Sequence, residues 1–415
     1  MPRGFHPLIA AQFVSALADN ALLIVAIALL HERQMAPWLA PMLKFGFTIA
    51  YVVLAPVVGP LADAVRKGRL MAWMNAVKVL GVAALLADVH PVAGLCIVGL
   101  GAAAYAPAKY GLITELVPAK RLVAANGWIE VSVVCAVLLG TVCGGLLVSP
   151  AWLGGPVVAA LAAAAGADPL AVSLASLLSL YALAGLLNLG VPDSGARYPS
   201  TPLHPRALWR DFGQAQRALW RDAEGGLSLS VTTLFWGVGA TLQFIVLRWA
   251  GEQLQLPLSQ ATYLQGVVAL GVIAGAAAAG RWVPLSAARH MLGFGVLLGL
   301  AMPLLAQVDS LVLALPLLVA VGAVGGLLVV PLNALLQHRG CQLLSAGRSI
   351  AVQGFNENAS VLAMLATYAA LTALAVPLRW LMTGFGLLVA TAILLLMLRA
   401  WRRDAAPGAQ DLTCP

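Results

Sequence analysis

Four ionisable residues lie deep inside long apolar segments of this chain. Asp19 stands beside Asn20 near the middle of one such segment, QFVSALADNALLIVAIALL, and Lys78, Glu130 and Glu357 lie within three others. A charged side chain at the centre of a bilayer costs about 2.5–3.5 kcal/mol, so it usually faces a cavity or an oppositely charged partner. Such groups can bind a charged substrate, carry protons, or join two helices through an ion pair.

The composition shows which kind of fold must position these residues. Of the 415 residues, 61% are hydrophobic and only 10% are charged, whereas a soluble domain carries about 25% charged residues. Apolar runs of about 20 residues, the length of a membrane-crossing helix, recur along the chain, and the alternation of a membrane barrel is missing. We therefore predict an all-α integral membrane protein with twelve transmembrane helices. The expected spans are 8–30, 43–61, 70–88, 92–110, 124–148, 170–190, 227–250, 258–281, 289–308, 311–336, 347–372 and 377–400.

The basic residues predict the orientation of these spans. With the N-terminus in the cytoplasm, nineteen of the 24 Lys and Arg residues fall on the cytoplasmic side, and Lys78 falls within a span. This bias predicts that both termini are cytoplasmic, and it explains the net charge of +8 without nucleic-acid binding. The five cysteines are scattered and form no CxxC pair or His/Cys cluster, so we expect no metal site and no cofactor.

A long polar stretch, residues 192–226, divides the spans into two sets of six. We predict an N-terminal half (1–191), a cytoplasmic linker (192–226), a C-terminal half (227–403) and a cytoplasmic tail (404–415). Two six-span halves joined by a cytoplasmic loop are the major facilitator architecture.

The linker contains an amphipathic pattern. Leu208, Phe212 and Leu219 recur at helical spacing with Arg and Asp on the opposite side, which predicts a helix lying on the inner membrane surface. A solvated linker is the alternative. Residues 151–170 form either a second amphipathic segment or an extension of span six, and Asp168–Pro169 favours a break there.

The loop between spans two and three reads GPLADAVRKGRLM and is typical of major facilitator transporters. Gly59 and Asp63 have the expected spacing, and Arg66, Gly68 and Arg69 follow two residues later than is common. A glycine permits a tight turn, and a carboxylate can pair with a base or cap a helix end. We predict a conformational latch here; an ordinary positive-inside loop is the alternative.

The segment GAAAYAPAKYG, residues 101–111, contains a further candidate site. Pro107 is expected to break the span just before Lys109, and the ring of Tyr105 suits a membrane interface. Lys109 could hold an anionic phosphate or extend to the inner headgroups, with Glu115 as a possible partner. The full set of candidate substrate-binding residues is Asp19, Asn20, Lys78, Tyr105, Lys109, Glu130, Gln243, Arg248, Asn356 and Glu357.

Six segments closely resemble the bacterial lysophospholipid transporters of the major facilitator superfamily. They are SALADNALL, YAPAKYG, AANGWIE, TLFWGVGATLQF, VVPLNALLQHRG and SIAVQGFNEN, and they occur in the family's order. The resemblance implies a protein of the bacterial inner membrane that moves lysophosphatidylethanolamine and related lipids from the outer to the inner leaflet. A separate acyltransferase–acyl-carrier-protein synthetase would then restore the second chain, and we expect the transporter to be a monomer.

The same resemblance implies roles for individual residues and shows one departure. Asp19 and Glu357 stand at the family's charged positions in spans one and eleven. Span seven of the family carries an Arg where this chain has Gln243, and an Arg appears five residues later as Arg248. Five residues turn a helix by about 500°, so Arg248 points about 140° away from that position. A network of Asp, Arg and Glu therefore does not transfer unchanged.

Two other functions compete with lysophospholipid transport. A proton-coupled drug exporter of the same fold would use Asp19 and Glu357 as proton carriers. A membrane-embedded acyltransferase is disfavoured, because no His is followed five residues later by Asp and no GxSxG segment is present. For a lipid substrate, we expect small residues such as Gly325 and Gly326 to line a lateral gap for the acyl chain.

Overall fold

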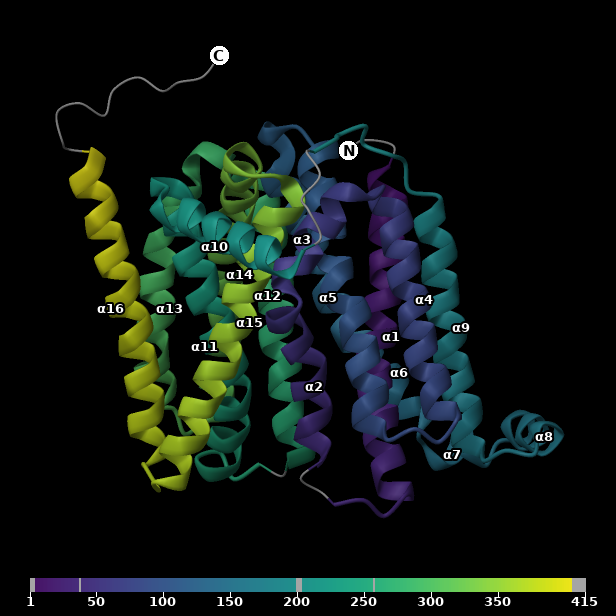
Figure 1. The fold of residues 1–415 in the computed structure, drawn as a ribbon. Coiled ribbons are helices and arrows are strands. Elements are labelled where there is room, and N and C mark those ends of the chain that lie inside the picture. The colour runs from purple at the N-terminus through teal and green to yellow at the C-terminus, as the bar shows by residue number, and fades with distance from the viewer. Residues whose placement is uncertain (1–3, 37–38, 199–203, 257, 405–415) are drawn as a thin grey trace. The chain divides into compact units, whose positions relative to one another are not determined.

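The computed structural model describes residues 4–36, 39–198, 204–256 and 258–404 (Figure 1). These residues form α-helices and two short 3-10 helices, without a β-strand in the described ranges. In chain order the helices are α1 (Phe5–Glu32), α2 (Leu39–Val53), α3 (Ala55–Ala64), α4 (Lys67–Leu86), α5 (Pro91–Leu116), η1 (Ala119–Arg121), α6 (Leu122–Leu147), α7 (Pro150–Leu153), α8 (Pro156–Ala165), α9 (Pro169–Leu189), α10 (Pro205–Arg221), α11 (Ala223–Glu252), α12 (Leu258–Trp282), η2 (Leu285–Met291), α13 (Leu292–Leu305), α14 (Leu311–Leu343), α15 (Ala346–Ala373) and α16 (Leu378–Asp404).

The helices agree with the predicted all-α membrane fold. Within the described residues, ten helices are long and apolar enough to cross a membrane, and α2 with α3 makes an eleventh if the pair is one span bent by 65°. Each of the twelve predicted spans overlaps a helix or this bent pair. The remaining span corresponds to α15, which falls outside the count because Asn356, Glu357 and Asn358 lower its hydropathy. The twelve predicted spans are consistent with the structure.

The bend in span two follows from its sequence. Pro56 is the second residue of α3 and has no backbone N–H, so it cannot continue the hydrogen bonding of α2. Leu54 stands alone between the two helices. The bend sends the end of α3, with Asp63, toward the start of α15, where it forms the contacts described below.

Residues 151–170 contain most of α7, the separate short helix α8 and only the first two residues of α9, so they are not an extension of span six. Gly166 ends α8 in the left-handed conformation, with φ +60°, which glycine adopts without strain. Asp168 then precedes Pro169 as the N-cap of α9. The predicted break at Asp168–Pro169 is therefore present.

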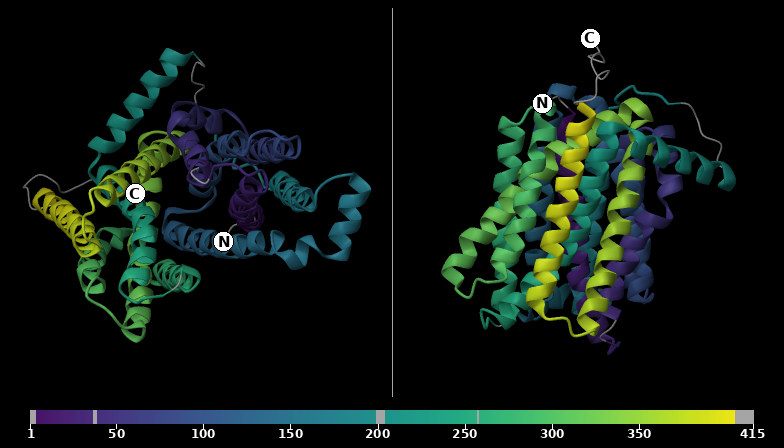
Figure 2. Two further views of the ribbon diagram at one scale, coloured as in Figure 1. Left: turned by 90° about the horizontal axis from the view of Figure 1, so that it is seen from below. Right: turned by 90° about the vertical axis from the view of Figure 1, so that its left-hand side faces the viewer.

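The chain divides into two compact units. Unit 1 contains residues 1–119, 129–216 and 340–358, with the described parts as given above. Within it α4 packs against α5 and α9, α9 packs against α1, and α2 packs against α5; the left view of Figure 2 shows these helices end on. Leu22, Val25 and Leu177 are among the buried apolar residues at the centre of this packing.

Unit 2 contains residues 120–128, 217–339 and 359–415, of which the last eleven lie outside the described residues. Its helix α16 packs against α11 and α13, and α11 packs against α12. Helices α12 and α14 approach so closely that a Cβ at Gly326 would lie 2.6 Å from the backbone nitrogen of Ala276. The expected lateral gap at Gly326 is therefore wrong: this glycine permits helix–helix contact, and a larger side chain would force the two helices apart.

Helix α10 has the amphipathic character predicted from the linker. Leu208, Phe212 and Leu219 are buried along one face. The opposite face exposes four arginines, flanked by the exposed rings of Trp209 and Trp220. The four are Arg206, Arg210, Arg217 and Arg221.

Candidate functional site

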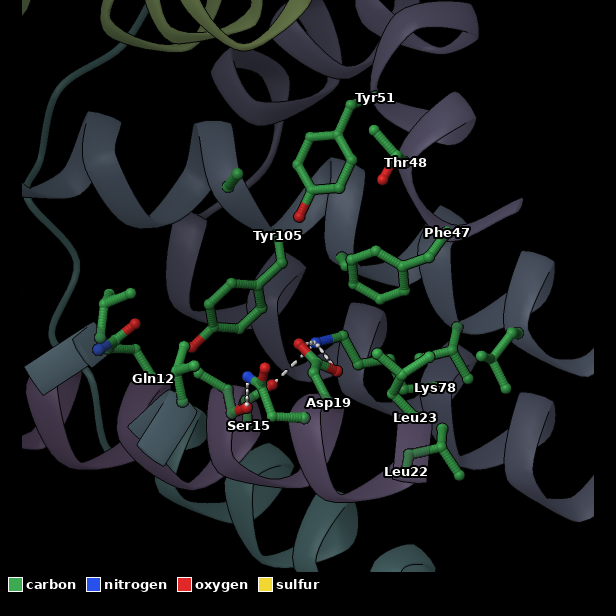
Figure 3. Close-up of a pocket in the computed structure, with 18 of the residues that line it drawn as sticks. Gln12, Ser15, Asp19, Leu22, Leu23, Phe47, Thr48, Tyr51, Lys78 and Tyr105 are labelled. Carbon is green, nitrogen blue, oxygen red and sulfur yellow. Dashed lines mark hydrogen bonds and ion pairs between the residues drawn. The ribbon is translucent and has the colours of Figure 1, made fainter. Parts of the chain in front are cut away.

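A cavity of about 320 Å³ lies within unit 1, between α1, α2, α4, α5 and α6 (Figure 3). Its lining is mostly apolar, but several polar side chains project into it. Five predicted substrate-binding residues line this cavity: Asp19, Asn20, Lys78, Tyr105 and Lys109. The structure therefore brings together half of the residues that the sequence proposed for the site.

An ion pair between Asp19 and Lys78 is the central feature of the cavity. The Lys78 ammonium lies 2.9 Å and 2.8 Å from the two carboxylate oxygens of Asp19. The Lys78 side chain is only 2% exposed, whereas that of Asp19 is 18% exposed. The lysine is therefore enclosed by protein, and the carboxylate remains accessible from the cavity. In Figure 3 the two side chains meet in the lower part of the cavity, near Tyr105.

Three polar side chains from other positions hold this pair in place. Lys78 donates to the Ser15 hydroxyl at 3.0 Å, and Ser15 donates to Asn75 Oδ1 at 2.9 Å. The Tyr181 hydroxyl donates to Asp19 Oδ1 at 2.8 Å. The Lys78 ammonium also lies 5.5 Å from the ring centroid of Tyr181, within the range of a cation–π contact. Each charge thus keeps hydrogen-bond partners although it is removed from bulk water.

Helical periodicity explains why these residues converge. Ser15 and Asp19 are four residues apart on α1, so they lie on one face of that helix, and Asn75 and Lys78 are three residues apart on α4. Tyr181 reaches the site from α9, which packs against both α1 and α4. The sequence predicts which residues share a face of α1 or of α4, but it does not predict that α9 packs against these faces.

Lys109 lies at another part of the cavity and is 9% exposed. Its ammonium donates to Gln12 Oε1 at 3.3 Å and lies 4.1 Å from the ring centroid of Tyr110. Gln12 in turn donates to the Ser132 hydroxyl at 2.8 Å. Lys109 is therefore a buried cavity residue, and the alternative that it extends to the headgroups is wrong.

Three expectations about this segment are also wrong. Pro107 does not end the helix, because α5 continues from Pro91 to Leu116 with Pro107 inside it; neighbouring helices make such a proline tolerable in a membrane span. Tyr105 does not lie at an interface: it is 5% exposed, and its hydroxyl donates to Asn188 Oδ1 at 3.3 Å. Glu115 pairs with Lys67 rather than Lys109.

Glu130 is buried near the cavity without lining it. In the described part of the chain its carboxylate makes no hydrogen bond or ion pair, and Lys109 is the cation that acts on it electrostatically. Asn20, which does line the cavity, donates to the carbonyl of Ala16 one turn earlier in α1.

The remaining predicted binding residues lie outside this cavity. Glu357 accepts a hydrogen bond from Gln353 at 2.8 Å, and Asn356 donates to Gln216 at 2.9 Å. In unit 2, Gln243 donates to Gln265 at 3.1 Å. Arg248, also in unit 2, makes an ion pair with Glu252 one turn further along α11, at 2.5 Å.

The predicted latch residues form a second polar cluster within unit 1. Asp63 Oδ1 accepts a hydrogen bond from the Gly347 backbone N–H at 2.9 Å, and its other oxygen accepts one from Ser345. Asp63 thereby caps the N-terminus of α15, where an anion also interacts favourably with the helix dipole. A Cβ at Gly59 would lie 3.0 Å from the Arg348 Cα, so glycine permits this close approach.

A buried ion pair lies beside this cap. Lys67 and Glu115 are joined at 2.6 Å, with side chains 5% and 4% exposed. Glu115 also accepts hydrogen bonds from Ser194 at 2.5 Å and from the Tyr198 hydroxyl at 3.0 Å. Burial raises the pKa of the Tyr198 hydroxyl, so it stays protonated and remains a donor. The start of the linker therefore covers the Lys67–Glu115 pair.

The other latch residues contact the linker or remain exposed. Arg66 pairs with Asp193 at 3.1 Å, and Arg69 is exposed, with no ion pair in the described ranges. Gly68 lies within the first turn of α4 rather than in a turn between helices. A Cβ there would lie 3.0 Å from the Val191 carbonyl oxygen, so this glycine serves close packing and not a reversal of the chain.

Several site residues were missing from the sequence prediction. The Asp19–Lys78 pair is held in place by Ser15, Asn75 and Tyr181. The second ion pair includes Lys67, and the cavity lining includes Lys44. A signal existed for Ser15 and Asn75, each within one turn of a mid-membrane charge. Among the described residues, no group of three or more His, Cys, Asp or Glu side chains is arranged to hold a metal ion.

Comparison with known proteins places these sites in a family context. The family model of the Major Facilitator Superfamily matches residues 8–340. The lysophospholipid transporter LplT of Citrobacter koseri is 40% identical over 402 residues, which cover 97% of this chain and 96% of that protein. The lysophospholipid transporter LplT of Yersinia enterocolitica is 39% identical over 378 residues, covering 91% and 89%.

Solved structures with little sequence similarity share the fold. A bacterial homologue of the iron transporter ferroportin, in an outward-facing state, has a TM-score of 0.72 at 15% identity, covering 97% of this chain and 100% of that one. The transporter FucP, in the outward conformation, also has a TM-score of 0.72 at 15% identity, covering 97% and 99%. The fold of this chain is therefore that of these transporters.

Proposed function

The chain belongs to the lysophospholipid transporter family of the major facilitator superfamily, and we propose that it moves lysophospholipids across the bacterial inner membrane, from the outer to the inner leaflet. Both termini would be cytoplasmic, as the distribution of Lys and Arg predicts. A separate acyltransferase–acyl-carrier-protein synthetase would then add the second acyl chain to the delivered lipid. The transporter would act as a monomer.

The observation that carries this proposal is the similarity to two transporters named for lysophospholipids, at about 40% identity over nearly the full length of both chains. The cavity in unit 1 supports it on physical grounds. A lysophospholipid has a charged head and a single apolar chain, so its carrier needs charged groups beside an apolar wall. The Asp19–Lys78 pair provides the first, and residues such as Leu22, Leu23 and Phe47 provide the second.

The acyl chain supplies no net driving force for crossing the membrane. Removing a CH₂ group from water is worth about 0.8 kcal/mol, but a chain that starts and ends in hydrocarbon leaves no water. The barrier is instead the desolvation of the head. Asp19 would attract an ammonium of the head and Lys78 its phosphate, so the internal ion pair exchanges for two pairs with the substrate. Ser15 and Tyr181 would keep the two side chains oriented during this exchange.

The second cluster would act as the conformational latch. Asp63 joins the end of α3 to the start of α15, and the Lys67–Glu115 pair joins the start of α4 to the end of α5 beneath the linker. These contacts would hold the cytoplasmic side closed while the head is bound from the other side. Breaking the cap of Asp63 on α15 would open that side.

The test is uptake of labelled lysophosphatidylethanolamine into spheroplasts with and without this protein. We expect uptake that depends on the protein and falls when unlabelled lysophospholipid competes. Altering the head should change uptake more than altering the length of the acyl chain does. Equal uptake with and without the protein would overturn the proposal, and protein-dependent export of hydrophobic drugs unaffected by lysophospholipid would indicate the exporter instead.

A further inference from the structure

Three lysines line the cavity of unit 1: Lys44, Lys78 and Lys109. Asp19 is the one carboxylate among the described residues of the lining. The function proposed above uses the Asp19–Lys78 pair and leaves Lys44 and Lys109 unexplained. A cavity with this balance of charges favours an anion.

The three lysines lie at different depths. A Cβ at Gly46 would lie 2.8 Å from the Cys96 sulfur, so α2 and α5 are level at these residues, and Lys44 precedes Gly46 by two positions. A Cβ at Gly101 would lie 2.9 Å from Cγ of Lys78. Lys78 is therefore level with Gly101, which lies five residues after Cys96 on α5.

Lys109 lies deeper along the same helix. It follows Gly101 by eight residues, which is about 12 Å of helix, and Cys96 by thirteen, which is about 20 Å. The hydrocarbon core of a bilayer is about 30 Å thick. Lys44, Lys78 and Lys109 thus form a series of cations that covers much of that thickness.

Lys44 and Lys109, at the two ends of the series, can each donate further hydrogen bonds. An ammonium has three donors, and the Lys109 ammonium has one acceptor, Gln12 Oε1, besides its contact with the Tyr110 ring. Lys44 is exposed and makes no ion pair or hydrogen bond within the described part of the chain. Lys78 differs, because Asp19 and Ser15 already occupy its donors.

We propose that Lys44, Lys78 and Lys109 are successive binding positions for the phosphate of the lipid head as it crosses the membrane. This inference rests on the proposed function. The phosphate first pairs with the exposed Lys44, then competes with Asp19 for Lys78, and then pairs with the buried Lys109. No covalent bond changes; one ion pair replaces another at each step, so the phosphate is never left without a cation in a medium of low dielectric constant.

The series defines the substrate class by its phosphate. Any single-chain lipid with an anionic phosphodiester should use it, and a monoacylglycerol, which lacks the phosphate, should neither cross nor compete. A positive group on the head is not required for recognition by the lysines.

The experiment measures initial transport rates of labelled lysophosphatidylethanolamine in proteoliposomes that contain the full chain. The variants are Lys44→Gln, Lys109→Gln, Lys44→Arg and Lys109→Arg. Lys120→Gln is the matched control, because it removes one positive charge from an exposed surface residue outside the cavity. We expect Lys109→Gln to lower the maximal rate at least tenfold and Lys44→Gln to raise the half-saturating concentration several-fold. The Arg variants should regain part of each loss, and the control should match the wild type.

Two outcomes separate the inference from the proposed function. If the wild-type protein transports lysophosphatidylethanolamine and both Gln variants match it, the lysine series is wrong and the proposed function stands. If the wild-type protein transports no lysophospholipid, the proposed function itself fails. Should Lys109→Gln not fold, Lys44→Gln decides the matter, because Lys44 is exposed and its replacement leaves no buried charge unpaired.

Discussion

Two lysine–carboxylate pairs in unit 1 have the same ionic chemistry but different surroundings. Asp19 and Lys78 meet beside a cavity, and the Asp19 carboxylate is 18% exposed. Lys67 and Glu115 are both about 5% exposed or less, and the linker residues Ser194 and Tyr198 fill the remaining acceptor positions of Glu115. Under the proposed function, the first pair would exchange partners with the substrate, whereas the second would change only with a movement of the linker that covers it.

The difference shows how one kind of interaction serves two purposes. A buried ion pair is weak evidence for stability, because desolvation offsets much of the attraction. The role of a buried ion pair therefore depends on whether a solute or only another segment of the chain can contact it. The Asp19–Lys78 pair lies beside a cavity that a charged solute could enter, whereas Ser194 and Tyr198 of the linker cover the Lys67–Glu115 pair.

The largest effect is expected from Asp19→Asn. The change leaves Lys78 buried without its counter-ion, which costs about 3–5 kcal/mol, and removes the exchangeable carboxylate from the cavity. We expect transport of lysophosphatidylethanolamine to fall at least tenfold and the melting temperature to drop. The double variant with Lys78→Met should recover stability without recovering transport. Asp88→Asn, which alters an exposed ion pair with Arg33, is the control. Near-normal transport by the Asn variant would place the pair among purely structural contacts.

Glu115→Gln tests the second of the two pairs, Lys67–Glu115. The change weakens the pairing with Lys67 and the contact with the linker, so we expect the segment around Tyr198 to separate from its neighbours. Cys341 offers a probe, because its sulfur lies 3.9 Å from the Tyr198 hydroxyl. In a protein whose other cysteines are replaced by serine, maleimide labelling of Cys341 should speed up several-fold.

Transport should fall less in Glu115→Gln than in Asp19→Asn, because the cavity is intact. Tyr198→Phe removes one hydrogen bond to the carboxylate and the contact of the hydroxyl with the Cys341 sulfur, but it leaves the Lys67–Glu115 pair in place, so it should give an intermediate labelling rate. Unchanged labelling of Cys341 in both variants would show that the linker does not depend on the Lys67–Glu115 pair.

The sequence was sufficient for the fold, and half of the residues that it proposed for the site line one cavity. Twelve apolar runs and the distribution of basic residues predicted helices that the structure contains, because the bilayer requires about 20 apolar residues for each span. The depth of Asp19 and Lys78 in their spans marked them as candidate site residues, and the structure places both at one cavity. Their pairing was not readable, since helical periodicity fixes the face of a residue but not the helix that it meets. Tyr181 lies 162 residues from Asp19 along the chain.

The errors in the site prediction have physical causes. Pro107 was expected to end a helix, but tight packing around α5 supports the helix through that position. Two roles were open for Lys109, and the alternative that it extends to the headgroups was wrong, because Gln12 and Tyr110 hold it inside the cavity. Both depend on contacts with neighbouring helices, which one segment of sequence does not contain.

Arg248 provides a surface pair against which the two buried pairs can be judged. It joins Glu252 one turn along α11, and their side chains are 29% and 51% exposed. Exposed pairs of this spacing are worth about 0.3–0.5 kcal/mol. We expect Arg248→Ala to keep at least half of the wild-type transport rate, with little change in melting temperature. Loss of transport in this variant would mean that Arg248 fulfils the role of the Arg that the family carries at the position of Gln243.

The smallest effect is expected from Asp193→Asn at the start of the linker. Hydrogen bonds from Arg197 lower the pKa of the Asp193 carboxyl to about 2, from an ordinary value of 3.8. A carboxyl whose pKa is lowered by folding contributes stability that is complete above its unfolded value and is lost as the pH falls through about 2. The bridge between Arg66 and Arg197 should therefore be fully formed at both pH 5.5 and pH 7.5.

Transport by Asp193→Asn should differ from that of the wild type by less than twofold at each of these two pH values. The ratio of the two rates should be the same at both. The reason is that solvent already screens this exposed bridge, while the buried Lys67–Glu115 pair carries the attachment of the linker. A ratio that changes between pH 5.5 and pH 7.5 would mean that Asp193 titrates in that range, which the hydrogen bonds from Arg197 do not permit. A large loss of transport at both pH values would show that the exposed bridge through Asp193, and not the buried Lys67–Glu115 pair, attaches the linker.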